Sequence, residues 1–301
     1  MGGSCQGRVA IITGAGRGLG RAHALLFAAE GARVVVNDVG VASDGTGGDA
    51  GPAEQVAQQI RAAGGEAVAD THDVADWDGA GALVQTALDH FGGLDTLVCN
   101  AGILRDRMFV SSSVEEWDAV MHVHLRGHYC PARHATAWWR AQAKAGATVD
   151  ARLINTSSGA GLQGSIAQAA YAAAKGGIAA LTLVQAAELG RYGITANALA
   201  PAARTRMTEG PFAEMMKAPQ DGFDAWDPAN VSPLVVWLGS AASRAVTGRV
   251  FETQGGVISL ADGWRTGPAV DKGARWEPGE VGDAVATLLG QAAAPQKVYG
   301  T

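Results

Sequence analysis

The sequence predicts an α/β protein, a single domain built on a doubly wound parallel sheet with helices on both of its faces. Two observations lead to this prediction. A strand–turn–helix–strand unit lies near the N-terminus, and strand-like apolar runs alternate with helical stretches along the rest of the chain, which favours a parallel sheet. The chain has 301 residues, enough to bury about three quarters of its unfolded surface as one domain. We therefore expect one domain over residues 1–301.

The N-terminal unit has the order of a nucleotide-binding site. Residues 8–12 form a short apolar, β-branched run that is typical of a buried strand. A glycine-rich turn follows at 13–20, then a helical pattern over 21–30 and a second strand over 31–38. This order within about thirty residues is the dinucleotide-binding unit of Rossmann-type sheets. The glycines let the backbone approach a pyrophosphate, which lies at the positive N-terminus of the helix. Asp38 ends the second strand, near the roughly 20-residue spacing expected of the acid that binds a ribose 2′-hydroxyl.

Tyr171 and Lys175 are the candidate proton-transfer pair. Residues at i and i+4 share one helix face, so the Lys175 ammonium can lie beside the Tyr171 hydroxyl. A nearby cation favours the phenolate, and we expect it to lower the tyrosine pKa from its usual value of about 10. Ser158 follows an apolar stretch and is placed to hydrogen-bond the oxygen whose proton Tyr171 moves. Alone, a Tyr-x-x-x-Lys pair is also compatible with an ordinary solvated helix face.

Together these motifs resemble the short-chain dehydrogenase/reductase family. The resemblance covers roughly residues 7–265 and leaves 266–301 as a C-terminal extension. It implies that Ser158, Tyr171 and Lys175 are catalytic. It also implies that the following residues bind the cofactor: Gly14, Arg17, Gly18, Leu19, Gly20, Asp38, Asp73, Val74, Asn100, Ala101, Gly102, Tyr171, Lys175, Pro201 and Thr205.

Two positions depart from the family pattern. His124 stands where the family usually has an asparagine that holds a proton-relay water, so its relay role is open. Pro201 is followed by Ala202 instead of glycine, and Thr205 falls one residue early for the family's threonine.

A narrower resemblance is to the (3R)-hydroxyacyl-CoA dehydrogenase domains of type 2 peroxisomal multifunctional enzymes. It is carried by residues 35–40, 101–107, 122–127 and 201–208. Histidine at position 124 is itself typical of that subgroup. The resemblance implies NAD-dependent interconversion of a secondary alcohol and a ketone, with a fatty or steroid-derived (3R)-hydroxyacyl-CoA as substrate. Two alternatives are a dehydrogenase of free 17β-hydroxysteroids and a non-catalytic nucleotide-binding or scaffold protein.

The cofactor prediction depends on two charges. Asp38 favours NAD because its carboxylate would hydrogen-bond the ribose and repel the 2′-phosphate of NADP. Arg17 precedes Gly18, where many NADP-dependent relatives also carry a base. We expect Asp38 to dominate, and NAD to be preferred to NADP.

Composition bears on partners and location. The net charge of −6 argues against nucleic acid as a general partner, and no apolar run approaches the length of a membrane span. Three scattered cysteines favour no disulfide framework. His124 and His128 have a zinc-compatible spacing, but no further ligand completes a site, so we expect no metal. We expect a cytoplasmic enzyme, and the family resemblance implies a homodimer or homotetramer.

Two segments bear on the substrate. Residues 204–227 contain Met and aromatic side chains that suit a fatty or steroidal group, although residues 211–217 also fit an ordinary helix. The extension includes a helical pattern over 281–291 and either covers a neighbouring subunit or packs against its own domain.

Overall fold

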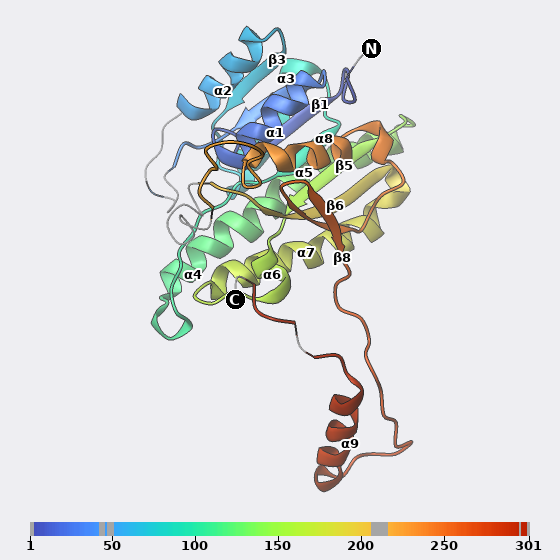
Figure 1. Ribbon diagram of the computed structural model, residues 1–301. Coiled ribbons are helices and arrows are strands. Elements are labelled where there is room, and N and C mark those ends of the chain that lie inside the picture. The colour runs from blue at the N-terminus through green and yellow to red at the C-terminus, as the bar shows by residue number, and fades with distance from the viewer. Residues whose placement is uncertain (1–2, 42–45, 47–50, 206–215, 295, 300–301) are drawn as a thin grey trace.

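The central sheet confirms the predicted fold class. The computed structural model describes residues 3–41, 46, 51–205, 216–294 and 296–299. Its sheet has eight strands in the order β3-β2-β1-β4-β5-β6-β7-β8 (Figure 1). The strands are β1 Val9–Thr13, β2 Arg33–Asn37, β3 Glu66–Asp70, β4 Thr96–Cys99, β5 Ala151–Thr156, β6 Ile194–Ala202, β7 Val250–Gln254 and β8 Val257–Ala261. All neighbouring pairs are parallel except β7 and β8.

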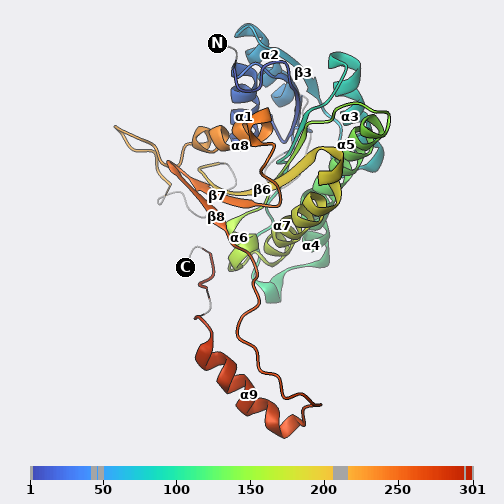
Figure 2. The same cartoon turned by 90° about the vertical axis from the view of Figure 1, so that its right-hand side faces the viewer.

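Helices cover both faces of the sheet, as the two views show (Figures 1 and 2). The α-helices are α1 Gly18–Ala29, α2 Gly51–Ala62, α3 Trp77–Phe91, α4 Val114–Met121, α5 Gly127–Lys144, α6 Gly159–Gln163, α7 Ala169–Leu189, α8 Ser232–Gly239 and α9 Pro278–Gln291. A π-helical turn, η2 His122–Arg126, joins α4 to α5. Short 3₁₀ turns are η1 Phe109–Ser111, η3 Gly190–Tyr192, η4 Pro228–Val231 and η5 Ala241–Ser243. None of the described helices combines the length and apolar character needed to cross a membrane.

The sheet has a hydrophobic core on each of its faces, because successive side chains of a strand point to opposite faces. Ala10 and Ile12 of β1 pack with helices α1, α2 and α8. Val9 and Ile11 of the same strand pack with α3 and α5 on the other face. Both sets are fully or almost fully buried. Burial on both faces explains why the first strand is a continuous apolar run in the sequence.

The last strand departs from the parallel prediction. β7 and β8 form an antiparallel hairpin through Gly255 and Gly256, and Gly255 has a positive φ of 53°. A two-residue glycine turn of this kind joins antiparallel strands directly, whereas a parallel neighbour needs a long crossover. After β8 the chain enters the C-terminal extension, where α9 confirms the helical pattern expected over residues 281–291.

Candidate active site

A cavity of about 490 Å³ lies at the carboxyl ends of the parallel strands. The strand order reverses between β1 and β4, and in open α/β sheets ligands bind at this point. The volume falls within the range of roughly 300–1,000 Å³ usual for small-molecule sites. The predicted residues that line it are Gly14, Arg17, Gly18, Leu19, Asp38, Asp73, Val74, Asn100, Ala101, Gly102, His124, Ser158, Tyr171, Lys175, Pro201 and Thr205. The structure therefore brings together every predicted site residue except Gly20.

Gly20 lies behind the cavity wall and shapes the turn. A Cβ at this position would lie 2.2 Å from the carbonyl oxygen of Gly14, which is a backbone atom. Gly14 has a positive φ of 64°, and a Cβ there would lie 2.8 Å from the Cα of Ala101. The two glycines thus allow helix α1 to start directly against β1 and β4. This cradle without side chains fits the pyrophosphate of NAD or NADP at the N-terminus of α1.

Asp38 is fixed at the adenosine end of the cavity by backbone groups. Its Oδ2 accepts a hydrogen bond from the N–H of Gly16 at 2.8 Å, and its Oδ1 accepts one from Gly40 at 2.7 Å. The Arg17 guanidinium points to the carbonyl of Val41 at 3.5 Å. The carboxylate is therefore held in one orientation before any ribose binds.

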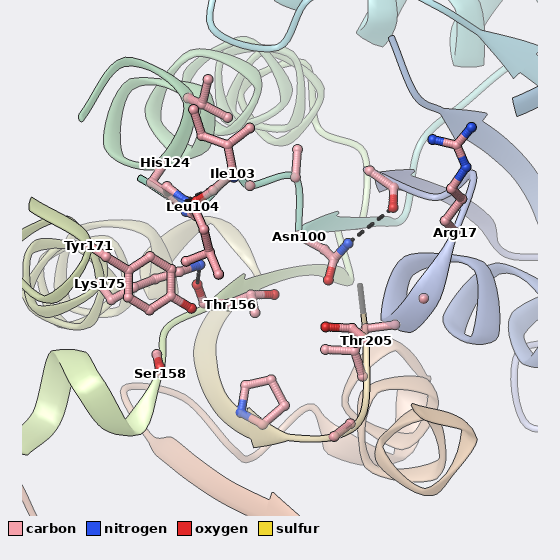
Figure 3. Close-up of a pocket in the computed structure, with 18 of the residues that line it drawn as sticks. Arg17, Asn100, Ile103, Leu104, His124, Thr156, Ser158, Tyr171, Lys175 and Thr205 are labelled. Atoms are coloured by element: carbon pink, nitrogen blue, oxygen red, sulfur yellow. Dashed lines mark hydrogen bonds between the residues drawn. The ribbon is translucent and has the colours of Figure 1, made fainter. Parts of the chain in front are cut away.

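Asn100 ties the end of β4 to the glycine-rich turn. Its side-chain amide donates to the carbonyls of Thr13 and Gly14 at 3.0 and 3.3 Å, and its N–H donates to the Thr13 hydroxyl at 2.8 Å. Figure 3 shows Asn100 between the Arg17 side of the cavity and the Tyr171 side. The segment Asn100-Ala101-Gly102 thus joins the two halves of the site.

The three predicted catalytic residues lie together at the other end of the cavity (Figure 3). Tyr171 and Lys175 project from the first turns of α7, and Ser158 is the N-cap of α6, where its hydroxyl accepts from the N–H of Ala160 at 3.2 Å. Lys175 is buried, and its Nζ donates to the Thr156 carbonyl at 2.6 Å. The same Nζ is 5.7 Å from the centre of the Tyr171 ring.

The expected lowering of the Tyr171 pKa is wrong for this arrangement. Burial raises the pKa of Tyr171 to about 12, against the lowering effect of its hydrogen bond with Ser158. Burial also lowers the pKa of Lys175 to about 7. The Lys175 ammonium is directed at the Thr156 carbonyl rather than at the phenol oxygen, so desolvation outweighs its attraction for the phenolate.

His124 occupies the position predicted from the family pattern and is completely buried. Its Nε2 lies 2.7 Å from the carbonyl oxygen of Ile103 and 3.1 Å from the nitrogen of that residue. Its ring meets Tyr171 edge-on at 5.1 Å, and a Cβ on Gly102 would lie 2.4 Å from its Cε1. Burial lowers the pKa of His124 to about 3, so the ring is a neutral imidazole. It holds the loop after β4 in place, and its relay role stays a prediction.

Replacing His124 by asparagine is expected to weaken the acid sensitivity of the fold. The folded-state pKa lies below the ordinary 6.5, so the unfolded chain binds a proton first as pH falls, and stability is lost from about pH 6.5 towards pH 3. The His124→Asn variant lacks this part of the loss of stability in acid. The part that comes from His23 stays, because burial also lowers the pKa of His23 to about 3. Urea midpoints at pH 7 and pH 4.5 measure the difference. His90→Asn, on an exposed part of α3, is the control, and equal pH slopes for wild type and His124→Asn would contradict the prediction.

Sequence reasoning missed several residues of the cavity wall, among them Gln168 and Tyr299. Gln168 donates to both oxygens of the Asp106 carboxylate at 3.2 and 3.1 Å. It follows Ala167, the one non-glycine residue with a positive φ (63°) among the described residues. The sequence signal that could have identified Gln168 as a cavity residue is its position one helical turn before Tyr171. Tyr299 reaches the cavity from the C-terminal extension, and nothing in the local sequence marks it.

The candidate substrate segment is only partly described. Residues 206–215 lie outside the described residues, so the expectation of a helix over 211–217 is not tested there. Met216 and Trp226 line the cavity, whereas Phe223 is exposed. Arg204 forms an ion pair with Asp224, which lowers the pKa of that carboxyl group. In the described residues, no group of three or more histidine, cysteine or acidic side chains is placed to hold a metal ion.

The fold and this site define an oxidoreductase that acts on a CH–OH group. The family model for short chain dehydrogenases matches residues 8–215. The chain belongs to the short-chain dehydrogenase/reductase family, whose members use NAD or NADP.

Individual relatives agree with this membership. The chain is 45% identical to "Hydroxyacyl-CoA dehydrogenase ChsB1" of Mycobacterium tuberculosis, covering 92% of this chain and 86% of that protein. It is 42% identical to the mouse "Peroxisomal multifunctional enzyme type 2" over 86% of this chain, but spans only 32% of that longer protein. A solved structure of a short chain dehydrogenase from Mycobacterium avium is 60% identical, covers 99% of this chain and 100% of its own, and superposes with a TM-score of 0.89.

Proposed function

We propose that this protein is an NAD-dependent dehydrogenase that reversibly oxidises the 3-hydroxyl group of (3R)-hydroxyacyl-CoA thioesters. The observation that supports the chemistry is the convergence of Ser158, Tyr171 and Lys175 at one end of a cavity whose other end is the glycine-rich turn. The thioester is inferred from the similarity to a hydroxyacyl-CoA dehydrogenase over nearly the whole chain.

Each residue has a distinct role in this proposal. NAD, when bound, accepts the hydride from the carbinol carbon. Tyr171 acts as general base in its phenolate form and takes the hydroxyl proton of the alcohol, a role worth about 10²–10⁴-fold in rate. The positive charges of Lys175 and of the nicotinamide ring, when NAD is bound, would favour that phenolate against the rise in its pKa that burial causes. Ser158 donates a hydrogen bond to the substrate oxygen, both as alcohol and as ketone. Lys175 contributes positive charge near the phenol and binds the nicotinamide ribose. In the reverse direction Tyr171 returns the proton to the ketone oxygen.

The substrate proposal is tested by NADH formation at 340 nm. The panel contains (3R)- and (3S)-hydroxyacyl-CoA thioesters of several chain lengths and free 17β-hydroxysteroids. We expect turnover of the (3R) thioesters. Exclusive turnover of free steroids would overturn the thioester in favour of the alternative, and turnover of any alcohol would exclude a non-catalytic scaffold.

We expect a preference for NAD over NADP that depends on Asp38. Its carboxylate, held by Gly16 and Gly40, would lie against the extra phosphate of NADP, and two like charges a few ångströms apart cost on the order of several kcal/mol at an effective dielectric constant near 20. Replacing Asp38 by asparagine removes the charge at nearly constant volume and should reduce the preference. The ratio of kcat/KM for the two cofactors measures it. Asp78→Asn, on α3, is the matched control, and a wild-type preference for NADP would contradict the assignment.

We also propose that the protein is a homo-oligomer. A mostly apolar groove runs over the end of α4, η2, α5 and α7. Its lining includes Met121, Leu125, Tyr129, Leu181 and Val184. About half of the surfaces of Tyr129 and Val184 are exposed, and exposed apolar patches often mark protein interfaces. Light scattering after size exclusion should give a dimer or tetramer, and Val184→Glu should lower the mass. A monomeric wild type would contradict this.

The cytoplasmic location remains an expectation that cell fractionation checks.

A further inference from the structure

The C-terminal extension leaves the sheet after β8, and its last described residues return to the cavity beside α6. Figures 1 and 2 show α9 standing away from the rest of the molecule, whereas the last described segment of the chain lies near α6. No residue between 262 and 294 is buried. Tyr299, in contrast, is partly enclosed and lines the cavity.

Tyr299 lies beside the catalytic residues, against Gly159 and Gly164. We call this contact surface its seat. Its N–H donates a hydrogen bond to the Gly164 carbonyl at 2.9 Å. Its ring lies so close to Gly159 that a Cβ there would be 2.3 Å from Cε2 and 2.4 Å from Cδ2 of the tyrosine. Gly159 has an ordinary helical role at the start of α6 and no positive φ. Glycine at position 159 is therefore explained by the close approach of the Tyr299 ring, which leaves no room for a side chain, and not by the backbone conformation.

The seat is in the substrate half of the cavity. Gly159 directly follows Ser158, and Figure 3 shows Ser158 and Tyr171 across the cavity from Arg17. Burial raises the pKa of Tyr299, and Glu252 adds to that rise. Tyr299 is in turn one of the lesser causes that raise the pKa of Tyr171. Both tyrosines line the same cavity, and Tyr299 is a neutral phenol there.

We propose that Tyr299 is a specificity-determining residue, which contacts the acyl part of the substrate and limits its bulk next to the carbon that is oxidised. This inference rests on the proposed alcohol oxidation at Ser158 and Tyr171. An aromatic ring offers a large, rigid apolar face to an alkyl group, together with one hydroxyl. Because the ring lies on the wall beside Ser158, its removal enlarges the substrate half of the cavity and leaves the glycine-rich turn unchanged.

The test is the substrate profile of Tyr299→Ala. We expect the ratio of kcat/KM for a bulky substrate to that for a short one to rise by about tenfold or more, a typical effect of reshaping an apolar pocket. The Kd for NADH, measured by its fluorescence, should stay the same. Tyr299→Phe should keep the wild-type ratio if the ring alone sets the limit. Val298→Ala changes the neighbouring residue, which does not line the cavity, and is the control.

A double-variant comparison tests the seat itself. Gly159→Ala places a methyl group where the ring lies and should shift the substrate ratio in the same direction as Tyr299→Ala. If the ring acts through this seat, the double variant should show no larger shift than Tyr299→Ala alone. Fully additive shifts would overturn the seat on Gly159, and an unchanged ratio in Tyr299→Ala would overturn the proposal.

The panel separates this proposal from the proposed function. If the wild type oxidises only free alcohols, the thioester is wrong, and the role of Tyr299 is judged by the ratio for bulky and small free alcohols. If the wild type oxidises (3R) thioesters and Tyr299→Ala has the same chain-length profile, the function stands and the role of Tyr299 is refuted.

Discussion

Tyr171→Phe is expected to lower kcat by about 10²–10⁴-fold, the contribution of a general base, while the Kd for NAD changes little. The substitution removes one oxygen atom and keeps the ring that packs edge-on against His124. In the proposed mechanism, the lost oxygen is the group that accepts the substrate proton. Its removal therefore affects the chemical step more than the binding of either ligand.

Single-turnover measurement of NADH formation separates that step from product release. Tyr192→Phe is the matched control, because Tyr192 accepts a hydrogen bond from Arg140 at an exposed position and does not line the cavity. A Tyr171→Phe enzyme with near-normal turnover would remove Tyr171 from the mechanism. A large rise in the Kd for NAD would assign it a binding role instead.

Lys175→Met is expected to reduce turnover and weaken NAD binding together, and to change how stability depends on pH. The pKa of Lys175 falls from 10.5 to about 7 on burial. The folded protein therefore holds this proton less tightly than the unfolded chain, so the contribution of Lys175 to stability rises with pH between about 7 and 10.5. A difference of one in pKa between the folded and unfolded states corresponds to about 1.4 kcal/mol of stability. Methionine has no titrating group, and the variant should lack this rise.

Urea unfolding of both proteins between pH 6 and pH 10 measures the effect as a difference between their stabilities. That difference cancels groups common to both that do not interact with Lys175, such as Cys5 with its raised pKa. NADH fluorescence gives the change in cofactor affinity. Lys144→Met, at the end of α5, is the control for loss of a surface charge. Parallel stability curves for wild type and Lys175→Met would show that burial does not shift the pKa of this amine. Unchanged NAD binding would remove its role at the ribose.

The fold was predictable because the strongest signals are local. The first strand is apolar on both faces, and the glycine-rich turn can be recognised from residues within a few positions of each other. The antiparallel β8 was missed because its direction follows from a two-residue turn between β7 and β8, at Gly255 and Gly256, and alternation of strands and helices says nothing about such an edge.

The site was predictable where residues are fixed by sequence neighbours. Tyr171 and Lys175 share a helix, and Asp38 ends a strand. The pKa of Tyr171 was predicted in the wrong direction because spacing on a helix does not give the depth of burial or the direction of the Lys175 ammonium. Tyr299 was missed for a different reason. It reaches Gly159 only after the whole extension, and a contact at that sequence separation leaves no periodic pattern.

The exposure of the C-terminal extension affects how the purified protein should be handled. The segment 262–294 presents no buried residue to shield its peptide bonds, and exposed segments of this kind are the preferred sites of proteolytic nicking. A single cut there would leave the sheet and both of its cores intact, because β8 is already complete. The clipped form would unfold at the same temperature and migrate as a slightly smaller chain, but Tyr299 would no longer be covalently joined to the part of the chain that carries Ser158 and Tyr171. Intact mass therefore needs to be checked alongside purity before substrate preferences are compared between preparations.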